Sequence, residues 1–377
     1  MKGTSPSRGC GEVAAFGIES DMMEFLDFIN TSGGESHEYY RHRNDLAKNI
    51  FAVHGINEVG KAERVKPRVS REQLVPLIAQ LPPCLIGMEA CSGAHHWARL
   101  LRQHGHTVKL IAPKFVTPYR MSGKQGKSDA ADAAAITEAV TRPTMRLVPI
   151  KEEHQQIILC LHRARQGFVE ERTATYNRLR GLIAEFGIVL PLKVSCLRHG
   201  IGAHLEALPG YANRCIGDLL DHADQLDLRI ADYDQAIAQA AREDARSRRL
   251  MQRPGIGPIT ASALVASIGN GHDFKNGRQV AAWIGLAPGQ HSSGGKSRLG
   301  HITKAGDSYL RSLLVMGARA VLNSIGEKQD YFSRWARDLV ARRGYWRAVV
   351  AIAAKNARLA WAVLHYGEDC RLNQHAT

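Results

Sequence analysis

Hydrophobic positions in the first half of the chain follow two different periods. Short apolar runs predict β-strands, and two segments in which apolar residues recur every three to four positions predict helices. The predicted strands are Ile50–Ile56, Ala62–Val69, Cys84–Met88 and Thr107–Ala112, and the predicted helices are Gly93–His104 and Asp129–Val140. Strands that alternate with helices over Asp45–Pro149 indicate an α/β domain.

The second half of the chain is predicted to be mostly helical. Lys151–Phe186 has the pattern of one long helix, Pro191–Gly217 is irregular, and Asp218–Leu250 is predicted to be a second long helix. Its apolar residues follow a heptad seam of Leu219, Ala223, Leu226, Ile230, Tyr233, Ile237 and Ala240. Two long amphipathic helices in succession predict a coiled coil, either as an intramolecular hairpin or as a dimer stalk. The remainder, Met251–Thr377, is expected to be a helical domain.

These patterns divide the 377 residues into five parts. Residues 1–38 are expected to be a poorly ordered extension with one or two helical turns. The other parts are an α/β domain at 39–150, coiled-coil helices at 151–250, a C-terminal domain at 251–368 and a tail at 369–377.

Charge narrows the classes of partner. The chain carries 50 Lys and Arg against 36 Asp and Glu, a net charge of +14. Residues 275–347 hold 13 Lys and Arg and 4 Asp and Glu, so +9 of this excess lies in one segment, which ends with Arg342, Arg343 and Arg347. A surplus of this size indicates a nucleic-acid partner, and these three arginines are candidate contacts to it. Every apolar run is too short to span a membrane. No secretory signal is visible, and the seven cysteines form no CxxC pair, so we expect a cytoplasmic protein.

Four carboxylates are candidate metal ligands. Asp45 precedes the first predicted strand, Glu89 follows the strand Cys84–Met88, and Asp129 and Asp132 lie three residues apart on one helix face. Oxygen ligands of this kind suit Mg²⁺, and a metal pair can activate an attacking oxygen and stabilise a leaving one. By spacing alone, Asp129 is equally well explained as a helix cap and Asp132 as a solvated side chain.

A glycine turn in the second half has the geometry of a phosphate site. Gly255 and Gly257 lie between Pro254 and Pro258, at the entry to an apolar helix, as in helix-hairpin-helix modules that bind DNA. Backbone N–H groups at such a helix start bind phosphate. The alternative is a plain turn that begins a core helix.

A serine in a glycine-rich loop is a candidate nucleophile. The loop reads Ser292-Ser293-Gly294-Gly295, and it is followed by basic residues that could stabilise charge on a phosphate: Lys296, Arg298 and Lys304. His291 and His301 are close by in the sequence. The alternative is a solvated Gly/Ser loop.

Taken together and in this order, the segments resemble one family. They are similar to the insertion-sequence transposases of the IS110 family, also called Piv/MooV-type or DEDD transposases, and the resemblance covers roughly residues 45–368. The matching segments are Asp45–Asn49, Ile86–Cys91, Lys109–Pro113, Ser128–Ala133, Leu161–Arg163, Pro254–Thr260, Phe274–Leu286, Ser292–Lys296 and Ile302–Gly306.

The resemblance implies a fold and a chemistry. It implies a RuvC-like (RNase H-like) N-terminal domain, a coiled-coil insert and a C-terminal transposase domain. Asp45, Glu89, Asp129 and Asp132 would hold Mg²⁺ or Mn²⁺, and Ser293, with Ser292 as runner-up, would attack DNA. The function implied is excision and insertion of the protein's own mobile element. The partners implied are DNA, a structured guide RNA in some members, and further copies of the chain in a homodimer or homotetramer associated with the nucleoid.

The sequence departs from this family before Asp45. Tyr39–Asn44 is basic and polar where the family has an apolar strand, and residues 1–38 have no counterpart in it. A shifted reading frame or a mis-assigned start upstream would account for both facts. Two alternatives therefore remain open: a metal nuclease like a Holliday-junction resolvase, and an inactive nucleic-acid-binding relic.

Overall fold

The computed structural model describes residues 13–18, 50–57, 62–120, 129–293 and 296–367. Contacts divide the chain into two compact units, Met1–Glu152 and Glu153–Thr377. The finer division at residues 250 and 251 stays a prediction, because the long helices and the C-terminal helices belong to the same unit. Among the described residues, no helix has the length and apolarity needed to cross a lipid bilayer.

The first unit is built on a six-stranded mixed sheet with the strand order β3-β2-β1-β4-β5-β6. The strands β1 and β4 are parallel, as are β4 and β5, whereas β2 is antiparallel to both β1 and β3, and β6 is antiparallel to β5. The strands are β1 (Val13–Ile18), β2 (Ile50–Ile56), β3 (Ala62–Ser70), β4 (Leu85–Glu89), β5 (Thr107–Ile111) and β6 (Leu147–Val148).

Helices pack against this sheet through two separate hydrophobic clusters. One cluster joins Phe51, Ile86 and Met88 of the strands to α2 (Arg71–Ala79) and α3 (Ala94–Gln103). The other cluster joins Ile111 to α5 (Asp129–Thr141). Two short elements precede α5: α4 (Pro113–Val116) and the 3₁₀ helix η2 (Thr117–Tyr119).

Most of the elements predicted for this unit are present, with two differences. The four predicted strands and both predicted helices are confirmed within one or two residues. The strand β1 was not predicted, because Val13–Ile18 lies within the segment expected to be a poorly ordered extension; the remaining residues of 1–38 lie outside the described ranges. The helix α2 was missed because Pro76 interrupts a weak pattern.

In the second unit, two long helices pack against each other. They are α6 (Glu153–Ala184) and α8 (Tyr211–Glu243), and α7 (Val194–His204) and η3 (Leu205–Ala207) connect them. Leu226, Ile230 and Ile237 of the predicted seam are buried within this single chain. The seam therefore has an intramolecular partner, and the prediction of a dimer stalk loses its main reason. A supercoil and the oligomeric state stay predictions.

Polar pairs fix the register of these helices. Asp227 of α8 receives a salt bridge from Arg172 of α6 at 2.7 Å and another from Arg198 of α7 at 2.7 Å, and Tyr176 donates its hydroxyl to Asp227 at 3.3 Å. Two helix limits also differ from the predictions. Part of Pro191–Gly217 is helical, and the predicted helix Asp218–Leu250 is interrupted at Asp244, whose side chain accepts a hydrogen bond from the Ser247 amide and so begins a new helix.

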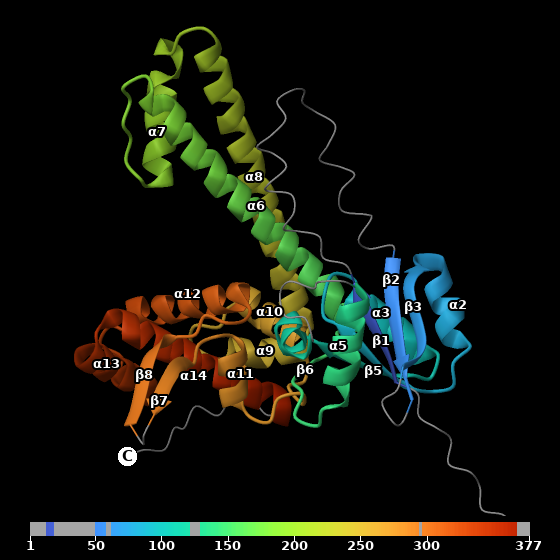
Figure 1. The fold of residues 1–377 in the computed structure, drawn as a ribbon. Helices are drawn as coiled ribbons and strands as arrows, with labels where there is room; N and C mark the ends of the chain where they lie inside the picture. Colours follow the sequence, from blue (N-terminus) through green and yellow to red (C-terminus); the bar gives the residue numbers. More distant parts are fainter. Residues whose placement is uncertain (1–12, 19–49, 58–61, 121–128, 294–295, 368–377) are drawn as a thin grey trace, which may run out of the picture. The chain divides into compact units, whose positions relative to one another are not determined.

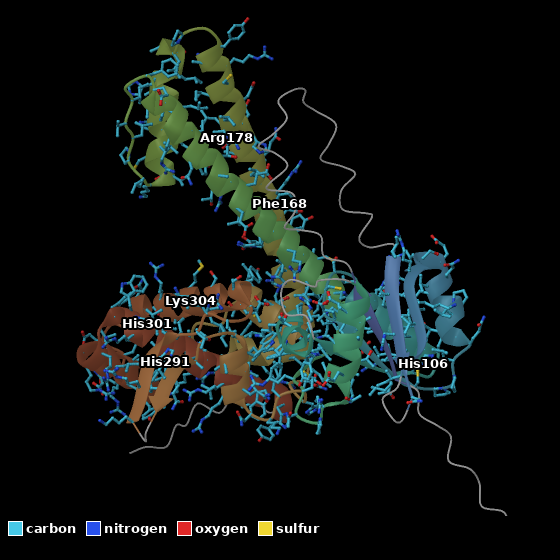
Figure 2. All side chains as sticks on the ribbon, viewed as in Figure 1. His106, Phe168, Arg178, His291, His301 and Lys304 are labelled. Atoms are coloured by element: carbon cyan, nitrogen blue, oxygen red, sulfur yellow. The ribbon has the colours of Figure 1, made fainter. Side chains whose placement is uncertain are left out.

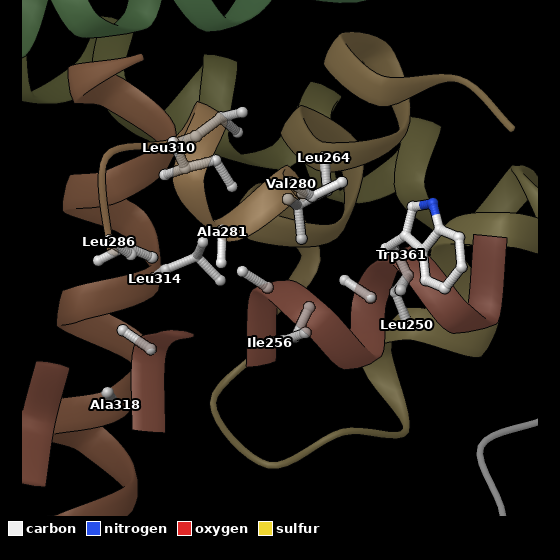
Figure 3. Packing of buried hydrophobic residues seen from close by; sticks show 14 of the residues in the cluster. Leu250, Ile256, Leu264, Val280, Ala281, Leu286, Leu310, Leu314, Ala318 and Trp361 are labelled. Atoms are coloured by element: carbon white, nitrogen blue, oxygen red, sulfur yellow. The ribbon is translucent and has the colours of Figure 1, made fainter. Parts of the chain in front are cut away.

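The rest of the second unit is a helical bundle with one hairpin. Its core contains apolar side chains from all six of its helices, among them Leu250, Leu264, Val280, Leu314 and Trp361 (Figure 3). The elements are α9 (Ala245–Met251), α10 (Pro258–Ile268), α11 (Gly277–Trp283), β7 (Pro288–Ser293), β8 (Lys296–Ile302), α12 (Ser308–Ser324), α13 (Tyr331–Arg343) and α14 (Tyr345–Tyr366).

A buried histidine joins the long helices to this bundle. His162 of α6 is 1% exposed, and its two ring nitrogens lie 2.9 Å from the Tyr309 hydroxyl of α12 and 3.1 Å from the Ser262 hydroxyl of α10. Two turns earlier along α6, Gln155 donates to the Ala266 carbonyl at 3.2 Å. The N-terminal end of α6 is thus held by side-chain hydrogen bonds to the bundle.

Candidate functional site

The side chains of β4 alternate between the two faces of the sheet. Ile86 and Met88 belong to the cluster with α2 and α3. Gly87 faces α5: a Cβ atom on this glycine would lie 2.9 Å from Cβ of Val140 and 3.1 Å from a methyl group of Ile136. Because residues two apart in a strand share a face, Glu89 lies on the α5 face of the sheet.

Asp132 lies on the same stripe of α5 as Ile136, one turn nearer to the start of the helix. Its carboxylate is buried and forms an ion pair with Arg120, which follows η2 and is itself largely buried. The predicted alternative of a solvated Asp132 is therefore wrong. Arg120 was not predicted as a partner of Asp132, because this pairing depends on how η2 packs beside α5.

The pKa of a neighbouring cysteine is affected by Glu89. Burial, and secondarily the Glu89 carboxylate, raise the pKa of the Cys91 thiol to about 11. The main chain here is fixed by the Ala90 amide, which donates to the Ile111 carbonyl at 2.8 Å. Glu89 thus lies at the end of β4 within electrostatic range of Cys91, on the face that also carries Asp132.

The other two predicted acids cannot be placed. Asp45 and the side chain of Asp129 lie outside the described residues, although the backbone of Asp129 begins α5. Among the residues that are described, no group of three or more His, Cys, Asp or Glu side chains is arranged to hold a metal ion. Convergence of all four acids therefore stays a prediction. The chemistry of Glu89 and Asp132 fits Mg²⁺ or Mn²⁺, but Arg120 now neutralises Asp132 and would have to release it.

The predicted serine loop is a two-stranded hairpin. Register pairs Ser293 with Lys296, Ser292 with Ser297 and His291 with Arg298. Opposed residues of an antiparallel pair share a face, as do residues two apart along a strand. His291, Ser293, Lys296 and Arg298 therefore occupy positions on one face, whereas Ser292 and Ser297 occupy the other.

The two serines have different surroundings. Ser292 is exposed, and its hydroxyl accepts a hydrogen bond from the side-chain amide (Nε2) of Gln290 at 2.8 Å. The side chain of Ser293 lies outside the described set, and its position is known from the backbone register alone. His291, Lys296 and Arg298 are exposed. The choice of Ser293 over Ser292 stays a prediction, and the register agrees with it because the cationic residues share the Ser293 face.

The base of the hairpin is tightly anchored. Lys304 has a φ of +53°, which is unusual for a residue other than glycine, and its amide donates to the Gly285 carbonyl at 3.1 Å. Gly306 passes so close to the Trp283 carbonyl that a Cβ atom would overlap it. Figure 2 shows His291 and His301 on the hairpin and Lys304 beyond its end. This anchoring fixes where the hairpin leaves the bundle.

The two glycines of the predicted phosphate turn differ in what lies next to their Cα atoms. Gly255 has a φ of +83° and packs against Gly317 of α12, where a Cβ atom would lie 2.8 Å from the Gly317 carbonyl oxygen. Intramolecular packing thus explains Gly255 without a ligand. Gly257 caps α10 and has no atom within 4 Å of its added Cβ, so its side is open. Phosphate binding at either glycine stays a prediction, and Gly257 is the better placed.

The predicted basic contacts at the C-terminal end lie on the surface. Arg342 and Arg343 end α13, and Arg347 lies in the first turn of α14; all three are exposed. In the sequence they flank Trp346, an exposed aromatic residue that was not among the predicted site residues. The available signal was a Trp beside several arginines, because Trp is enriched at interfaces.

Comparisons with known proteins agree with the expected family. Residues 44–188 match a family model for DEDD transposases of the IS110 type, described as "Transposase", and residues 247–333 match the model described as "Transposase IS116/IS110/IS902 family". The DEDD model implies a RuvC-like N-terminal domain. The match begins after β1, so this strand comes from outside the matched region.

Several curated relatives are similar over nearly their whole length. A "Probable family 20 transposase" of Pseudomonas aeruginosa is 46% identical over 85% of this chain and 95% of its own length. The "Transposase for insertion sequence element IS1111A" of Coxiella burnetii is 38% identical over 87% of this chain and 90% of its own. The "Transposase for insertion sequence element IS1328" of Yersinia enterocolitica is 37% identical over 86% of this chain and 96% of its own.

Proposed function

Because the chain belongs to the IS116/IS110/IS902 family of transposases, we propose that it excises and inserts its own mobile element with a serine nucleophile. The observation that carries the serine step is the hairpin register, which gives Ser293 the same face as His291, Lys296 and Arg298. A hydroxyl, a base and two cations at one exposed surface are the groups that phosphoryl transfer requires.

The proposed step conserves the energy of the phosphodiester bond. The Ser293 oxygen attacks phosphorus, a serine–phosphate bond forms, and one bond from phosphorus to a deoxyribose oxygen breaks. His291 accepts the hydroxyl proton, and the departing deoxyribose oxygen takes up a proton. Lys296 and Arg298 stabilise the extra negative charge on the phosphoryl oxygens. The reverse attack by a deoxyribose hydroxyl restores the serine and rejoins DNA.

The acids of the first unit are proposed to complete the site. Glu89 and Asp132, with Asp45 and Asp129, would hold Mg²⁺ or Mn²⁺, which supplies Lewis-acid stabilisation of phosphoryl charge when bound. Arg120 holds the buried Asp132 carboxylate and would have to release it for Asp132 to serve as a metal ligand. Acids and serine belong to different units, so we propose a composite site that assembles on DNA.

The proposed partners follow from the family and the charge. DNA is the substrate of a transposase. We also propose that a structured guide RNA pairs with this DNA and that the chain assembles into a homodimer or homotetramer. Charge reversal at Arg342, Arg343 and Arg347 should weaken binding to all DNA sequences alike and reduce the salt dependence of affinity, because each phosphate contact releases counterions.

A covalent adduct tests the function. The full chain is incubated with DNA of the element ends, Mg²⁺ and candidate guide RNA, and protein–DNA adducts are separated on a denaturing gel. We expect Ser293→Ala and Asp132→Asn to abolish the adduct while DNA affinity stays unchanged, and Ser292→Ala to retain most of it. An adduct that persists in Ser293→Ala and is lost in Ser292→Ala would move the nucleophile by one residue.

The same assay addresses the other functions. DNA cleavage without an adduct in the Ser292→Ala, Ser293→Ala double variant would identify water as the nucleophile and support a resolvase-like metal nuclease. DNA binding without cleavage in the unaltered protein would support the inactive relic. The sequence feature that favours this alternative is the polar segment before Asp45, where the family has an apolar strand.

A further inference from the structure

A large aromatic ring lies on the surface where α14 begins. Trp346 is 64% exposed, and Met316 of the neighbouring α12 is 61% exposed. The other tryptophans of this unit are packed in the bundle: Trp361 is 8% exposed and donates its indole N–H to the Gly271 carbonyl at 3.0 Å. We call Met316, Arg319, Asn323, Tyr345, Trp346 and Arg347 the Trp346 surface.

Neighbouring side chains hold the exposed ring in place. Tyr345 meets the Trp346 ring edge-on, with centroids 5.3 Å apart and an interplanar angle of 82°. The Tyr345 hydroxyl donates to Asn323 of α12 at 3.4 Å. The guanidinium of Arg319 lies 5.5 Å from the Trp346 ring centroid. The indole is therefore supported from α12 while most of its surface remains in water.

The sequence around this ring is mostly basic. Between Leu339 and Gly367 it contains five Lys and Arg and no Asp or Glu, and α12 contains two arginines and no acid; the nearest acid in the sequence is Asp338, one turn before Arg342. Arg342 and Arg343 end the helix before Trp346, and Arg347 follows it. A supported aromatic ring near several cations matches a strand of phosphates whose bases are exposed.

We propose that the Trp346 surface stacks an unpaired nucleobase, with Arg342, Arg343 and Arg347 on the flanking phosphates. The occupant is single-stranded nucleic acid, because bases inside a duplex are covered on both faces by their neighbours and present no face to an indole. This inference rests on the proposed function, in which strands separate and rejoin. DNA and RNA share the base faces and phosphates, so both are tested.

The test is equilibrium binding of the full chain to labelled probes, measured by fluorescence anisotropy. The probes are an oligothymidylate and an oligouridylate of about 20 nucleotides and a duplex of equal length. Stacking on an aromatic side chain contributes about 1–3 kcal/mol per base, so Trp346→Ala should weaken single-strand binding by about 5- to 150-fold. Duplex affinity and the salt slope should stay unchanged. A loss restricted to one of the two oligonucleotides identifies that nucleic acid as the occupant.

Two further variants separate stacking from other causes. Trp346→Phe keeps a ring and should bind single strands within about threefold of the unaltered protein. Tyr211→Ala removes an aromatic side chain that is 84% exposed at the start of α8, and it should have no effect. Thermal melts confirm folding of each variant.

The outcomes are distinguishable. Equal single-strand affinity in Trp346→Ala and the unaltered protein, or an equal loss for duplex, would overturn the stacking inference while leaving the serine adduct assay untouched. Absence of the adduct with normal, Trp346-dependent binding would overturn the proposed catalysis instead. Binding of no probe by the unaltered protein would overturn the inference and make a protein partner the occupant of this surface.

Discussion

Acid should loosen the second unit through His162. Burial, and secondarily Arg165, lower the pKa of His162 to about 4. The ring is neutral in the folded protein, with its nitrogens shared between the Tyr309 and Ser262 hydroxyls. In the unfolded chain the same ring has a pKa of about 6.5.

The sign and size of the effect follow from these two values. Between pH 6.5 and pH 4 the unfolded state binds more protons than the folded state, so stability is complete above pH 6.5 and falls as pH falls. For pKa values of about 4 folded and about 6.5 unfolded, the loss between pH 7 and pH 5 is about 2 kcal/mol. His162→Gln removes the titrating ring and keeps an amide that can hydrogen-bond.

Urea unfolding at pH 7 and pH 5 checks this reasoning. Tryptophan fluorescence reports mainly on the second unit, because only Trp97 of the five tryptophans lies in the first. We expect His162→Gln to be the less stable protein at pH 7 and the gap to narrow by about 2 kcal/mol at pH 5. His199→Gln, at an exposed histidine of α7, should keep the full pH dependence. An unchanged gap between His162→Gln and the unaltered protein at the two pH values would refute the assignment.

Two substitutions test packing and charge elsewhere. Gly317→Ala should destabilise the protein by about 1–3 kcal/mol in urea unfolding, because its Cβ would overlap a carbonyl oxygen in the turn before α10. Gly181→Ala, in a helix position with open space, should instead stabilise it by about 0.5–1 kcal/mol, and equal effects would contradict this packing. Arg120→Gln should cost about 3–5 kcal/mol without metal, since it leaves the buried Asp132 unpaired, and should increase the rise in melting temperature on adding Mg²⁺. Arg142→Gln, which breaks an exposed pair, should cost under about 1 kcal/mol, and a Mg²⁺ response unaffected by Arg120→Gln would count against the metal role of Asp132.

The sequence predicted the elements whose pattern is local. The strand Ile50–Ile56 is a short apolar run, and the predicted helix Lys151–Phe186 has apolar residues at three-to-four spacing, with gaps. The family motifs placed Glu89 and Asp132 on candidate site positions. The strand β1 was missed although Val13–Ile18 is a short apolar run, because it lies within the segment expected to be a poorly ordered extension. Its partners β2 and β4 lie more than thirty residues further along the chain, so the run alone does not show what it pairs with.

The missed features of the site depend on contacts between distant segments. A glycine pattern cannot say whether the open side of Gly255 meets a ligand or Gly317. The Gly294-Gly295 pair is a hairpin signal, but the polar strands around it lack the apolar alternation by which strands are identified. The ion pair of Arg120 with Asp132 arises from tertiary packing and has no sequence spacing of its own.

The hydrogen bonds of His162 hold α6 near its N-terminal end, and the helix continues from this anchor to Ala184. From His162 to the end of α6 at Ala184 the helix rises about 33 Å, at about 1.5 Å per residue. A rotation of about 5° at this anchor displaces the far end by about 3 Å, close to the rise of one nucleotide step along a DNA strand. A rotation of that size at Tyr309 and Ser262 would therefore move the far end of α6 by about the length of one nucleotide step.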